Sequence, residues 1–469
     1  MHSGAVAWAP PVVAASDLPR VVVDRDNVSI TSSCVVEIPP GHTIEDADGD
    51  GVIHIAADHI TIEFAPGSVL RGAPSDRPDD QLAGVGVRIA GRAGVALRGL
   101  RINGYRAAVH ASAADGLVIR DLRVERNYRQ RLGSTPIAED LADWLWPHHN
   151  DDNQWFTNYG AAVYVEDSRD VDVSKVHVRR SQNGIVLDRV DDSRVYDCDC
   201  SFLSGWGLAM WRSSRKYISR NAFGFCIRGY SHGAYNRGQD SAGIVCFEQS
   251  SFNRFYENSA THGGDGFFGF AGKQALGEKP PPDDAAPFDY AERGCNNNML
   301  LGNDFSFAAA HGVELTFSFN NTIRGNRLVG NAICGVWGGY SQRTGIIDNV
   351  IEDNGLPGMQ EGGGINIEHG LENVIAANRF ARNTVGVSLW SDDDGALLKT
   401  PWAAANHKGS DRNQVTDNAF TDEPVFLRLR QTPTTIVGRN QFEASPDQPD
   451  ADDLSTIEPA TDAHPPPMA

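Results

Sequence analysis

The sequence predicts an all-β fold, a parallel β-helix in which short strands wind into stacked coils of about 23 residues. Two repeats predict it, one of asparagine triplets and one of glycines that open short apolar runs, and both have the same period. Within these runs apolar residues alternate as they do in β-strands, and no helical pattern competes with the alternation. The 469 residues are therefore expected to form one long solenoid rather than several globular domains.

The asparagine repeat sets the length of one coil. The triplets are centred on Asn303, Asn326, Asn349, Asn378, Asn418 and Asn440, at steps of 23, 23, 29, 40 and 22 residues. The longer steps hold one coil plus an insertion. Asparagine suits a bend because it tolerates the left-handed backbone conformation, and its amide can bond neighbouring backbone or the same asparagine one coil away. We therefore expect these asparagines to stack in the bends.

The glycine repeat marks one strand in each coil. Its members are Gly184, Gly207, Gly243, Gly266, Gly312, Gly335, Gly364 and Gly386. The first and third residues after each glycine are expected to fill the interior, and the second and fourth to point outward. The outward positions include the aromatic residues Trp211, Phe247, Phe268, Phe270, Trp337 and Trp390. Because a solvent-facing sheet is normally polar, this aromatic stripe indicates a face that is covered or that binds a ligand.

The repeat also divides the chain. We expect an N-terminal extension over residues 1–19, whose apolar centre would suit an export segment, a β-helix over 20–445, and a flexible, acidic, Pro-rich tail over 446–469. Insertions interrupt the coils at 128–158, 229–241, 273–296, 352–362 and 391–412. They come just before or just after the glycine strand, so they flank the aromatic face from both edges. They predict either the walls of a cleft or a cover that makes a second small core.

Composition narrows the class of partner. The chain has 61 acidic and 41 basic residues, a net charge of −20, which opposes binding to nucleic acid or to an anionic membrane. It has no apolar run long enough to predict a membrane span. A neutral ligand fits better, and an oligo- or polysaccharide is expected because sugar rings stack on aromatic side chains while acids and amides bond hydroxyls. We expect a monomer or homotrimer, and a secreted or periplasmic location is favoured.

The coil pattern over about residues 20–445 resembles the right-handed parallel β-helix repeat proteins. This superfamily includes pectate lyases, polygalacturonases, polyuronate C5-epimerases, and carbohydrate-binding and sugar-hydrolysis repeat domains. The resemblance implies a right-handed coil and a carbohydrate ligand. It carries over no catalytic residue, because the polygalacturonase series Asn-Thr-Asp, Asp-Asp, Gly-His-Gly, Arg-Ile-Lys and the epimerase run Asp-Pro-His-Asp are both missing.

Glu314 is the leading candidate for a catalytic acid. It points outward between apolar side chains of adjacent coils, and desolvation there would raise its pKa towards the range of a general acid. Its alternative role is a structural carboxylate bonded to a loop backbone. Glu368, two coils onward, is the second candidate acid. The two Cα atoms should lie roughly 12 Å apart, farther than the carboxyl pairs of most glycosidases.

The stretch "HGGDGFFGF" supplies two further candidates, His262 and Asp265, in the bend before a glycine strand. His311 occupies the position of Asp265 one coil later, so the two could hydrogen-bond and the carboxylate would set the tautomer of the histidine. Strand alternation directs Asp265 inward, however, where a structural role is the alternative.

Residues expected to contact substrate fall into three groups. The outward aromatics are Trp211, Phe268, Trp337 and Trp390; the strand-end residues are Arg212, Glu248 and His369; and the loop 229–241 supplies His232, Arg237 and Asp240. The strand-end set could instead form an ion-pair ladder. No cofactor and no metal site are expected, although "DADGDGVIHI" has the aspartate-glycine pattern of calcium loops without the EF-hand spacing.

The sequence therefore predicts a carbohydrate-active enzyme that hydrolyses a glycosidic bond by carboxylate acid/base chemistry on the outer face of the β-helix. A polysaccharide lyase or uronate epimerase is the first alternative, with Arg212, Arg228, Arg237 and Lys273 as cations for the uronate carboxylate. A non-catalytic carbohydrate-binding or adhesion protein is the second alternative, since the aromatic stripe suffices for it.

Overall fold

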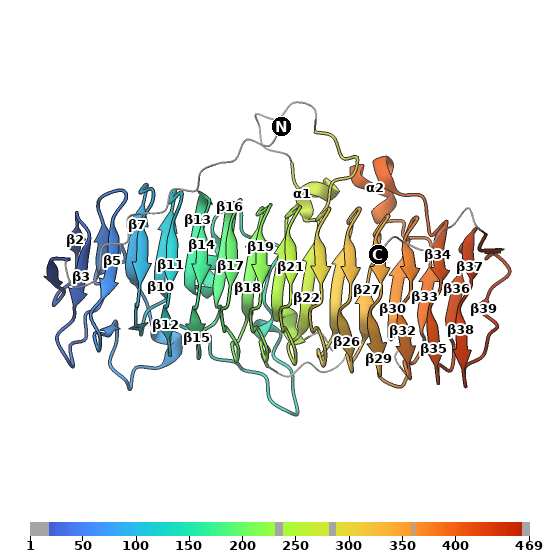
Figure 1. Cartoon of the computed structure of the whole chain (residues 1–469), viewed down its shortest axis with the longest axis horizontal. Coiled ribbons are helices and arrows are strands. Elements are labelled where there is room, and N and C mark those ends of the chain that lie inside the picture. The colour runs from blue at the N-terminus through green and yellow to red at the C-terminus, as the bar shows by residue number, and fades with distance from the viewer. Residues whose placement is uncertain (1–17, 230–237, 281–287, 359–361, 462–469) are drawn as a thin grey trace.

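A computed structural model describes residues 18–229, 238–280, 288–358 and 362–461. The described chain winds into one elongated right-handed parallel β-helix, with successive coils running from end to end of the molecule (Figure 1). Neighbouring strands of successive coils pair in parallel. The predicted all-β solenoid is confirmed.

Each coil contributes to two long sheets. Among the described residues the first sheet has 16 strands, in spatial order β1 (Arg20–Val22), β3 (Cys34–Glu37), β5 (Thr61–Phe64), β8 (Ala96–Arg98), β11 (Val118–Arg120), β14 (Asp172–Ser174), β17 (Arg194–Tyr196), β19 (Tyr217–Ser219), β21 (Arg254–Tyr256), β23 (Met299–Leu301), β25 (Thr322–Arg324), β28 (Gly345–Ile347), β31 (Val374–Ala376), β34 (Asn413–Thr416), β37 (Thr435–Gly438) and β40 (Ile457–Pro459).

The second sheet, which we call the site sheet, contains the glycine-marked strands. In the described chain it has 15 strands, in order β2 (Val28–Ile30), β4 (Ile53–Ile55), β7 (Val85–Ala90), β10 (Ala107–Ser112), β13 (Ala161–Arg169), β16 (Ile185–Asp191), β18 (Trp206–Trp211), β20 (Ala242–Phe247), β22 (Asp265–Phe270), β24 (His311–Thr316), β27 (Cys334–Trp337), β30 (Gly363–Glu368), β33 (Val387–Trp390), β36 (Leu427–Arg430) and β39 (Asp450–Ala451).

Shorter strands form a discontinuous third side. They are β6 (Leu70–Arg71) with β9 (Ile102–Asn103), β12 (Arg123–Val124) with β15 (His177–Val178), and the row β26 (Arg327–Val329), β29 (Val350–Glu352), β32 (Arg379–Ala381), β35 (Ala419–Thr421) and β38 (Gln441–Glu443). The helices are α1 (Lys273–Leu276), α2 (Pro401–Asn406), the short 3-10 turns Asp79–Gln81, Leu141–Asp143, Gly238–Asp240 and Leu397–Lys399, and the π-helical turn Trp155–Tyr159. No described helix has the length and apolar content of a membrane span.

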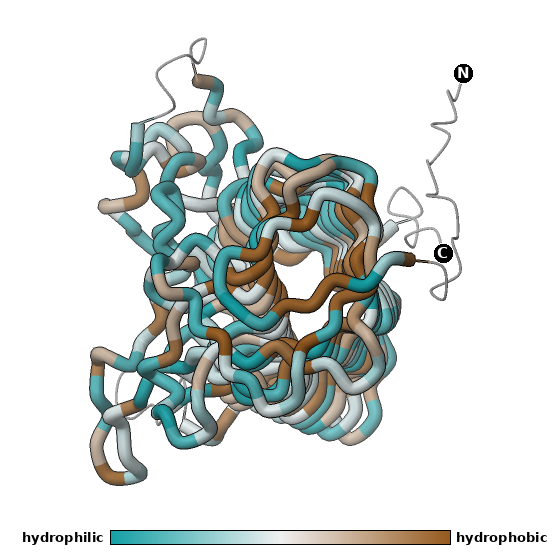
Figure 2. The backbone as a smooth tube through the Cα atoms, turned by 90° about the vertical axis from the view of Figure 1, so that its left-hand side faces the viewer, coloured by the Kyte–Doolittle hydropathy of each residue, from teal (hydrophilic) through white to brown (hydrophobic). Residues whose placement is uncertain are grey.

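Hydrophobic residues recur along the backbone of the stacked coils (Figure 2), and strand alternation turns their side chains into a core inside the coil. Ile185 pairs with Leu208, and both side chains are fully buried. The marker glycines are needed because the next coil comes too close for a side chain. A Cβ on Gly184 would lie 2.4 Å from the carbonyl oxygen of Gly207, and one on Gly266 would lie 2.5 Å from that of Gly312.

The predicted asparagine stack is present as a continuous ladder. The Nδ2 of Asn303 donates to Oδ1 of Asn326 at 3.0 Å, and Asn326 donates in the same way to Asn349 at 3.0 Å. The ladder continues to Asn440 at one residue per coil. The left-handed conformation falls on the residue before each asparagine, such as Asp348 at φ 56°, rather than on the asparagine itself. The asparagines therefore act through their amides, which satisfy buried backbone groups.

The expectation of an unpacked tail from residue 446 is wrong for the part of it that the structure describes, up to residue 461. β39 pairs in parallel with β36, and β40 pairs with β37, so the solenoid continues to Pro459. The cause is that an exposed sheet end still offers a row of backbone donors and acceptors, and polar residues can form a strand on it.

Replacing Asn349 by Ala should lower the free energy of unfolding by about 2–4 kcal/mol. Asn349 accepts both the N–H and the Nδ2 of Asn326, and its own amide donates to Asn378 and to the carbonyl of Ile323, so several buried groups lose partners. Guanidinium unfolding followed by circular dichroism measures the change. Gln441→Ala, at an exposed position of β38, is the control and should stay within about 0.5 kcal/mol of the parent. Equal midpoints for both variants would show that the ladder contributes no stability.

Candidate functional site

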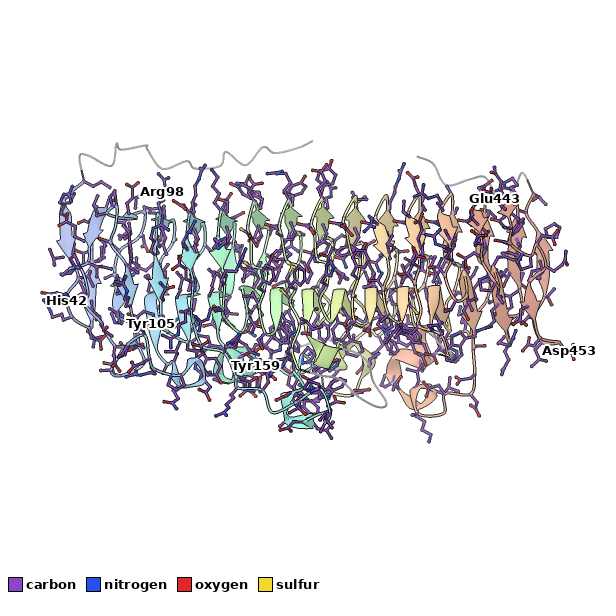
Figure 3. The ribbon with its side chains drawn as sticks, turned by 90° about the horizontal axis from the view of Figure 1, so that it is seen from below. His42, Arg98, Tyr105, Tyr159, Glu443 and Asp453 are labelled. Atoms are coloured by element: carbon purple, nitrogen blue, oxygen red, sulfur yellow. The ribbon has the colours of Figure 1, made fainter. Side chains whose placement is uncertain are left out.

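The first half of the aromatic stripe is covered. Residues 128–158, which we call the covering segment, project from one long side of the solenoid near Tyr159 (Figure 3) and pack on the site sheet. The Trp155 ring, at the end of this segment, lies 5.3 Å from the ring of Trp211 and 4.8 Å from that of Trp206. Trp211 and Phe247 are fully buried. The expectation that Trp211 contacts substrate is therefore wrong, because a second core forms over this part of the face.

Polar contacts fix the covering segment to the strand ends. The Nδ2 of Asn150 donates to Asp188 at 2.8 Å, and Asp151 forms an ion pair with Arg212 at 2.6 Å. Glu248 is buried beside Arg212 and accepts the backbone N–H of Lys273. Burial raises the pKa of Glu248 to about 7, against the opposing charge of Arg212. Arg212 and Glu248, expected to bind substrate, therefore anchor loops instead.

A second cover lies farther along the solenoid. Residues 273–280 and 391–412, which we call the helical cap, bring α1 and α2 together at the ends of the strands (Figure 1). Trp402 of α2 packs against the Phe317 ring at 5.0 Å, and its indole N–H donates to the carbonyl of Arg293 at 3.0 Å. Leu276 and Leu397 complete this apolar cluster.

A cleft of about 440 Å³ is lined by residues of the site sheet, its strand ends and the covering segment. The insertions that border it lie on one side of the coil when the solenoid is viewed along its axis (Figure 2). The lining residues are Trp144, His148, Asp240, Phe268, Phe270, Glu314, Thr316, Phe317, Trp337, Gly339 and Tyr340. Of the residues expected to act on substrate, Glu314, Asp240, Phe268 and Trp337 line this cleft.

Glu314 lies between aromatic neighbours, because β24 pairs with Phe268 on one side and with Trp337 on the other. Only 6% of Glu314 is exposed, although it lines the cleft. His311 is buried beside it, with Nε2 3.8 Å from Oε2 of Glu314. Asp265 accepts the backbone N–H of His311 at 2.9 Å. The structure thus brings Asp265, His311 and Glu314 together, and Asp265 bonds the backbone of His311.

A second polar cluster adjoins the cleft at Tyr340. The Tyr340 hydroxyl donates to Asp394 at 2.7 Å and lies 3.4 Å from Glu368, and its ring stacks on His369 at 4.9 Å. His369 Nε2 is 3.1 Å from Asp392. The hydrogen bond from Tyr340 lowers the pKa of Asp394, so this carboxyl stays ionised. Glu368 and His369 therefore belong to a different group from Glu314.

The remaining expected residues lie elsewhere. His262 stacks between Phe225 at 4.6 Å and Phe307 at 4.9 Å, in an aromatic ladder on another corner of the coil, and does not line the cleft. Trp390 donates its indole N–H to Asn366 at 2.7 Å. His232 and Arg237 lie outside the described residues.

The alternation of inward and outward residues along each strand did not predict two cleft residues, Phe317 and Tyr340. Each directly follows an outward position, at the same step of the coil as Arg212, Glu248 and His369. All five have a positive φ, from 47° to 57°. That turn conformation aims the side chain back over the sheet, and its recurrence one residue beyond the outward position was the available signal.

Trp144 and His148 could not be placed by the repeat, because the covering segment has none. His148 packs edge-on against Phe270, with ring centroids 4.9 Å apart. Burial, together with the nearby charges of Lys273 and His149, lowers the pKa of His148 to about 4. The imidazole of His148 therefore lines the cleft in its uncharged form near pH 7.

Three groups of side chains in the described chain could hold a cation. They are Asp265, His311 and Glu314; Glu368, His369 and Asp392; and Asp26, Asp46 and Asp48. The first two offer one imidazole and two carboxylates, a donor set that suits transition metals, and the third offers only carboxylates. The third includes two acids of the calcium-like loop, but Asp46 already accepts the backbone N–H groups of Gly49 and Val85, which is a structural use.

Comparison with known proteins agrees with this architecture. Residues 161–337 match the family described as "Right handed beta helix region", and residues 291–444 match "Periplasmic copper-binding protein (NosD)". No curated protein matches the chain.

Solved structures resemble the chain at low identity. The A-module of mannuronan C-5 epimerase AlgE6 from Azotobacter vinelandii is 13% identical with a TM-score of 0.47, and 92% of each chain is covered. The surface adhesin PfbA of Streptococcus pneumoniae is 10% identical with a TM-score of 0.43, over 80% of this chain and 84% of that one. The catalytic domain of a GH87 alpha-1,3-glucanase in complex with nigerose is 9% identical with a TM-score of 0.38, over 94% of this chain and 62% of that one.

These neighbours add no residue-level correspondence, so the assignment rests on the coils themselves. Parallel sheets run the length of the described chain, asparagine ladders connect the coils, and a family of right-handed β-helices matches residues 161–337. The chain is a right-handed parallel β-helix protein.

Proposed function

We propose that the cleft binds an oligo- or polysaccharide of neutral sugars and hydrolyses a glycosidic bond. The observation that carries the proposal is the position of Glu314. It is a nearly buried carboxyl between two aromatic strand neighbours, and it lines a cleft large enough for sugar rings. An acid in such apolar surroundings is suited to donate a proton to a leaving oxygen.

The aromatic lining supports sugar binding. Trp337, Phe268 and Tyr340 line the cleft, and the apolar face of a pyranose packs against such rings. Thr316 and Asp240 add oxygen atoms that can bond hydroxyl groups. The cleft thus combines an apolar platform with a few polar groups, as saccharide sites do.

Two carboxylates line the cleft, Glu314 and Asp240. In the proposed reaction Glu314 donates its proton to the glycosidic oxygen as that bond breaks. Asp240, on the segment before β20, is the candidate to activate the water or to attack the anomeric carbon. His311 is a positioning residue beside Glu314, and Asp265 holds the start of β24 through the His311 N–H. Glu368 serves in the Tyr340 cluster and takes no part in this reaction.

Charge favours a neutral substrate over the uronate of a lyase or epimerase. The described cleft lining contains no Arg or Lys, and His148 is neutral near pH 7, so a uronate would meet two acids without a cation. Of the cations considered for that alternative, Arg237 lies outside the described residues, and Lys273 Nζ lies 3.4 Å from His149 Nε2. Arg212 pairs with Asp151, and Arg228 donates to the carbonyl of Ser204 and to Gln130. The alternative of a non-catalytic binding protein requires only the aromatic lining. A measurement of substrate turnover distinguishes it from an enzyme.

Location and assembly follow as parts of the proposal. Residues 291–444 match a family described as periplasmic, which supports a secreted or periplasmic protein. The proposed assembly remains a monomer or homotrimer.

Glu314→Gln should reduce kcat by about a hundredfold or more while saccharide affinity stays close to the parent value, because only proton donation is lost. A panel of neutral and uronate polysaccharides first identifies the substrate through new reducing ends, and kcat and Kd of the variant follow by rate assay and calorimetry. Glu257→Gln, at an exposed corner position, is the matched control.

Three results would count against the assignment. An unchanged kcat in Glu314→Gln excludes it as the acid. Products that absorb as unsaturated uronates identify a lyase, and saturable binding without turnover identifies a binding protein. Asp265→Asn keeps an oxygen acceptor for the His311 N–H, so a purely structural Asp265 predicts parental kcat.

Trp337→Ala and Trp211→Ala should differ in saccharide binding. Trp337 lines the cleft, so its loss should weaken saccharide binding by about 1–2 kcal/mol, and because its ring is also buried against Ile333 and Cys334 it should lower the free energy of unfolding as well. Trp211 lies under Trp155, so its loss should lower the free energy of unfolding by about 3–5 kcal/mol. Calorimetry and denaturant unfolding of both variants measure the two effects. Weaker binding in Trp211→Ala than in Trp337→Ala, at equal stability, would reverse the assignment of open and covered face.

A further inference from the structure

A second pocket, of about 450 Å³, lies outside the carbohydrate cleft and has the opposite charge character. Five of its lining residues are arginines, Arg77, Arg126, Arg129, Arg131 and Arg180, and two are acids, Asp79 and Asp80. In a chain of net charge −20, so many guanidinium groups around one concave surface make a local positive field.

Successive coils build this pocket at one corner of the solenoid. Residues 75–80 follow β6, residues 126–131 follow β12, and Arg180 follows β15. These strands belong to the third side of the coil, and each of the three stretches lies in the turn that leads back to the site sheet. The coil repeat therefore stacks guanidinium groups from separate parts of the sequence.

Asp79 is shared among three of the arginines. Arg126 donates Nε to Oδ1 at 2.7 Å, and Nη1 and Nη2 donate to the carbonyls of Pro74 and Arg77, so each of its three nitrogens has a partner. Arg129 and Arg180 both reach Oδ2 of Asp79, at 3.3 and 3.4 Å. Burial opposes the charge of Asp79, but the bond from Arg126 and the charge of Arg180 hold its pKa below the usual range.

The contacts of Arg129 and Arg180 with Asp79 leave most of the hydrogen-bond donors of their guanidinium groups unused. Charge-assisted N–H···O bonds are usually about 2.7–2.9 Å long, and a guanidinium can form two in parallel with one oxyanion. Here each makes one long contact to the same oxygen, and both side chains are accessible, at 40% and 61% exposure. Arg131 has no ion-pair partner among the described residues.

We propose that this pocket binds an oxyanion, a phosphate, sulfate or carboxylate group, through Arg129, Arg180 and Arg131. The planar guanidinium fork matches such groups, and Arg126 with Asp79 holds the surrounding arginines in place. The proposal is independent of the proposed hydrolysis, because it rests on residues that do not line the carbohydrate cleft.

The pocket lies close to the covering segment, and this position limits the kinds of molecule that could carry the anion. A neighbouring hollow of about 360 Å³ shares Asp80, Gln130 and Arg131 with it and continues to Arg228 along the covering segment. That segment begins at the anion pocket and reaches the cleft at Trp144 and His148. The shared chemistry is an oxyanion, supplied either by a charged substituent on a saccharide whose neutral rings occupy the cleft or by free phosphate.

The test is calorimetric titration at low ionic strength with inorganic phosphate, with a sulfated disaccharide and with its unsulfated counterpart. The parent protein should bind at least one of the two anions saturably. For the double variant Arg129→Gln with Arg180→Gln, the Kd for that anion should rise by at least about 10-fold. Arg382→Gln with Arg412→Gln, which removes the same charge from exposed positions in coils β32 and β34, is the control and should bind as the parent does.

The outcomes separate the sources. Tighter binding of the sulfated than of the unsulfated sugar and of phosphate indicates a charged saccharide, whereas equal or tighter binding of phosphate indicates a free anion. The proposal is overturned if neither anion binds saturably, or if control and test variants lose affinity equally, which would show only a general charge effect. Circular dichroism of each variant confirms that the coils remain folded.

Discussion

The regular stacking of each coil on the next is the constraint on which the rest of the structure depends. A coil advances by about 4.8 Å, and an asparagine amide plus one hydrogen bond spans that step. The ladder from Asn303 to Asn440 therefore joins one amide to the next at 2.9–3.2 Å, and in each coil the same amide oxygen accepts a backbone N–H at 2.8–2.9 Å. Because this geometry tolerates no extra residue inside a strand, the insertions leave the solenoid where strands begin or end.

That restriction divides one aromatic stripe into two environments. Trp211 and Trp337 occupy equivalent outward positions, but Trp155 of the covering segment packs on Trp211, whereas Trp337 borders open volume. The same type of side chain lies under a loop in one coil and lines the cleft a few coils later. The cleft is thus the part of the face that neither the covering segment nor the helical cap fills, and Glu314 lies within that part.

Charged residues, like aromatic residues, are distributed unevenly along the solenoid. The cleft lining holds two acids and no described Arg or Lys, while one corner of the earlier coils concentrates five arginines around a pocket. A net charge of −20 hides this separation. Since each turn position recurs in every coil, a residue type repeated at one corner accumulates into a surface of one sign, and a single molecule can present two unlike sites.

The repeat by itself determined the solenoid, the coil length, the inward residues and the outward position of Glu314, because periodicity is local and strand alternation is strict. It also predicted that Asp265 and His311 would meet on adjacent coils. It could not decide whether Trp211, Arg212 and Glu248 face ligand or a covering loop, nor place Trp144 and His148, since insertions have no repeat to register them. Phe317 and Tyr340 were missed because a left-handed turn, rather than strand alternation, directs their side chains. Which part of the face stays open was decided only by tertiary packing, through contacts between residues far apart in the chain.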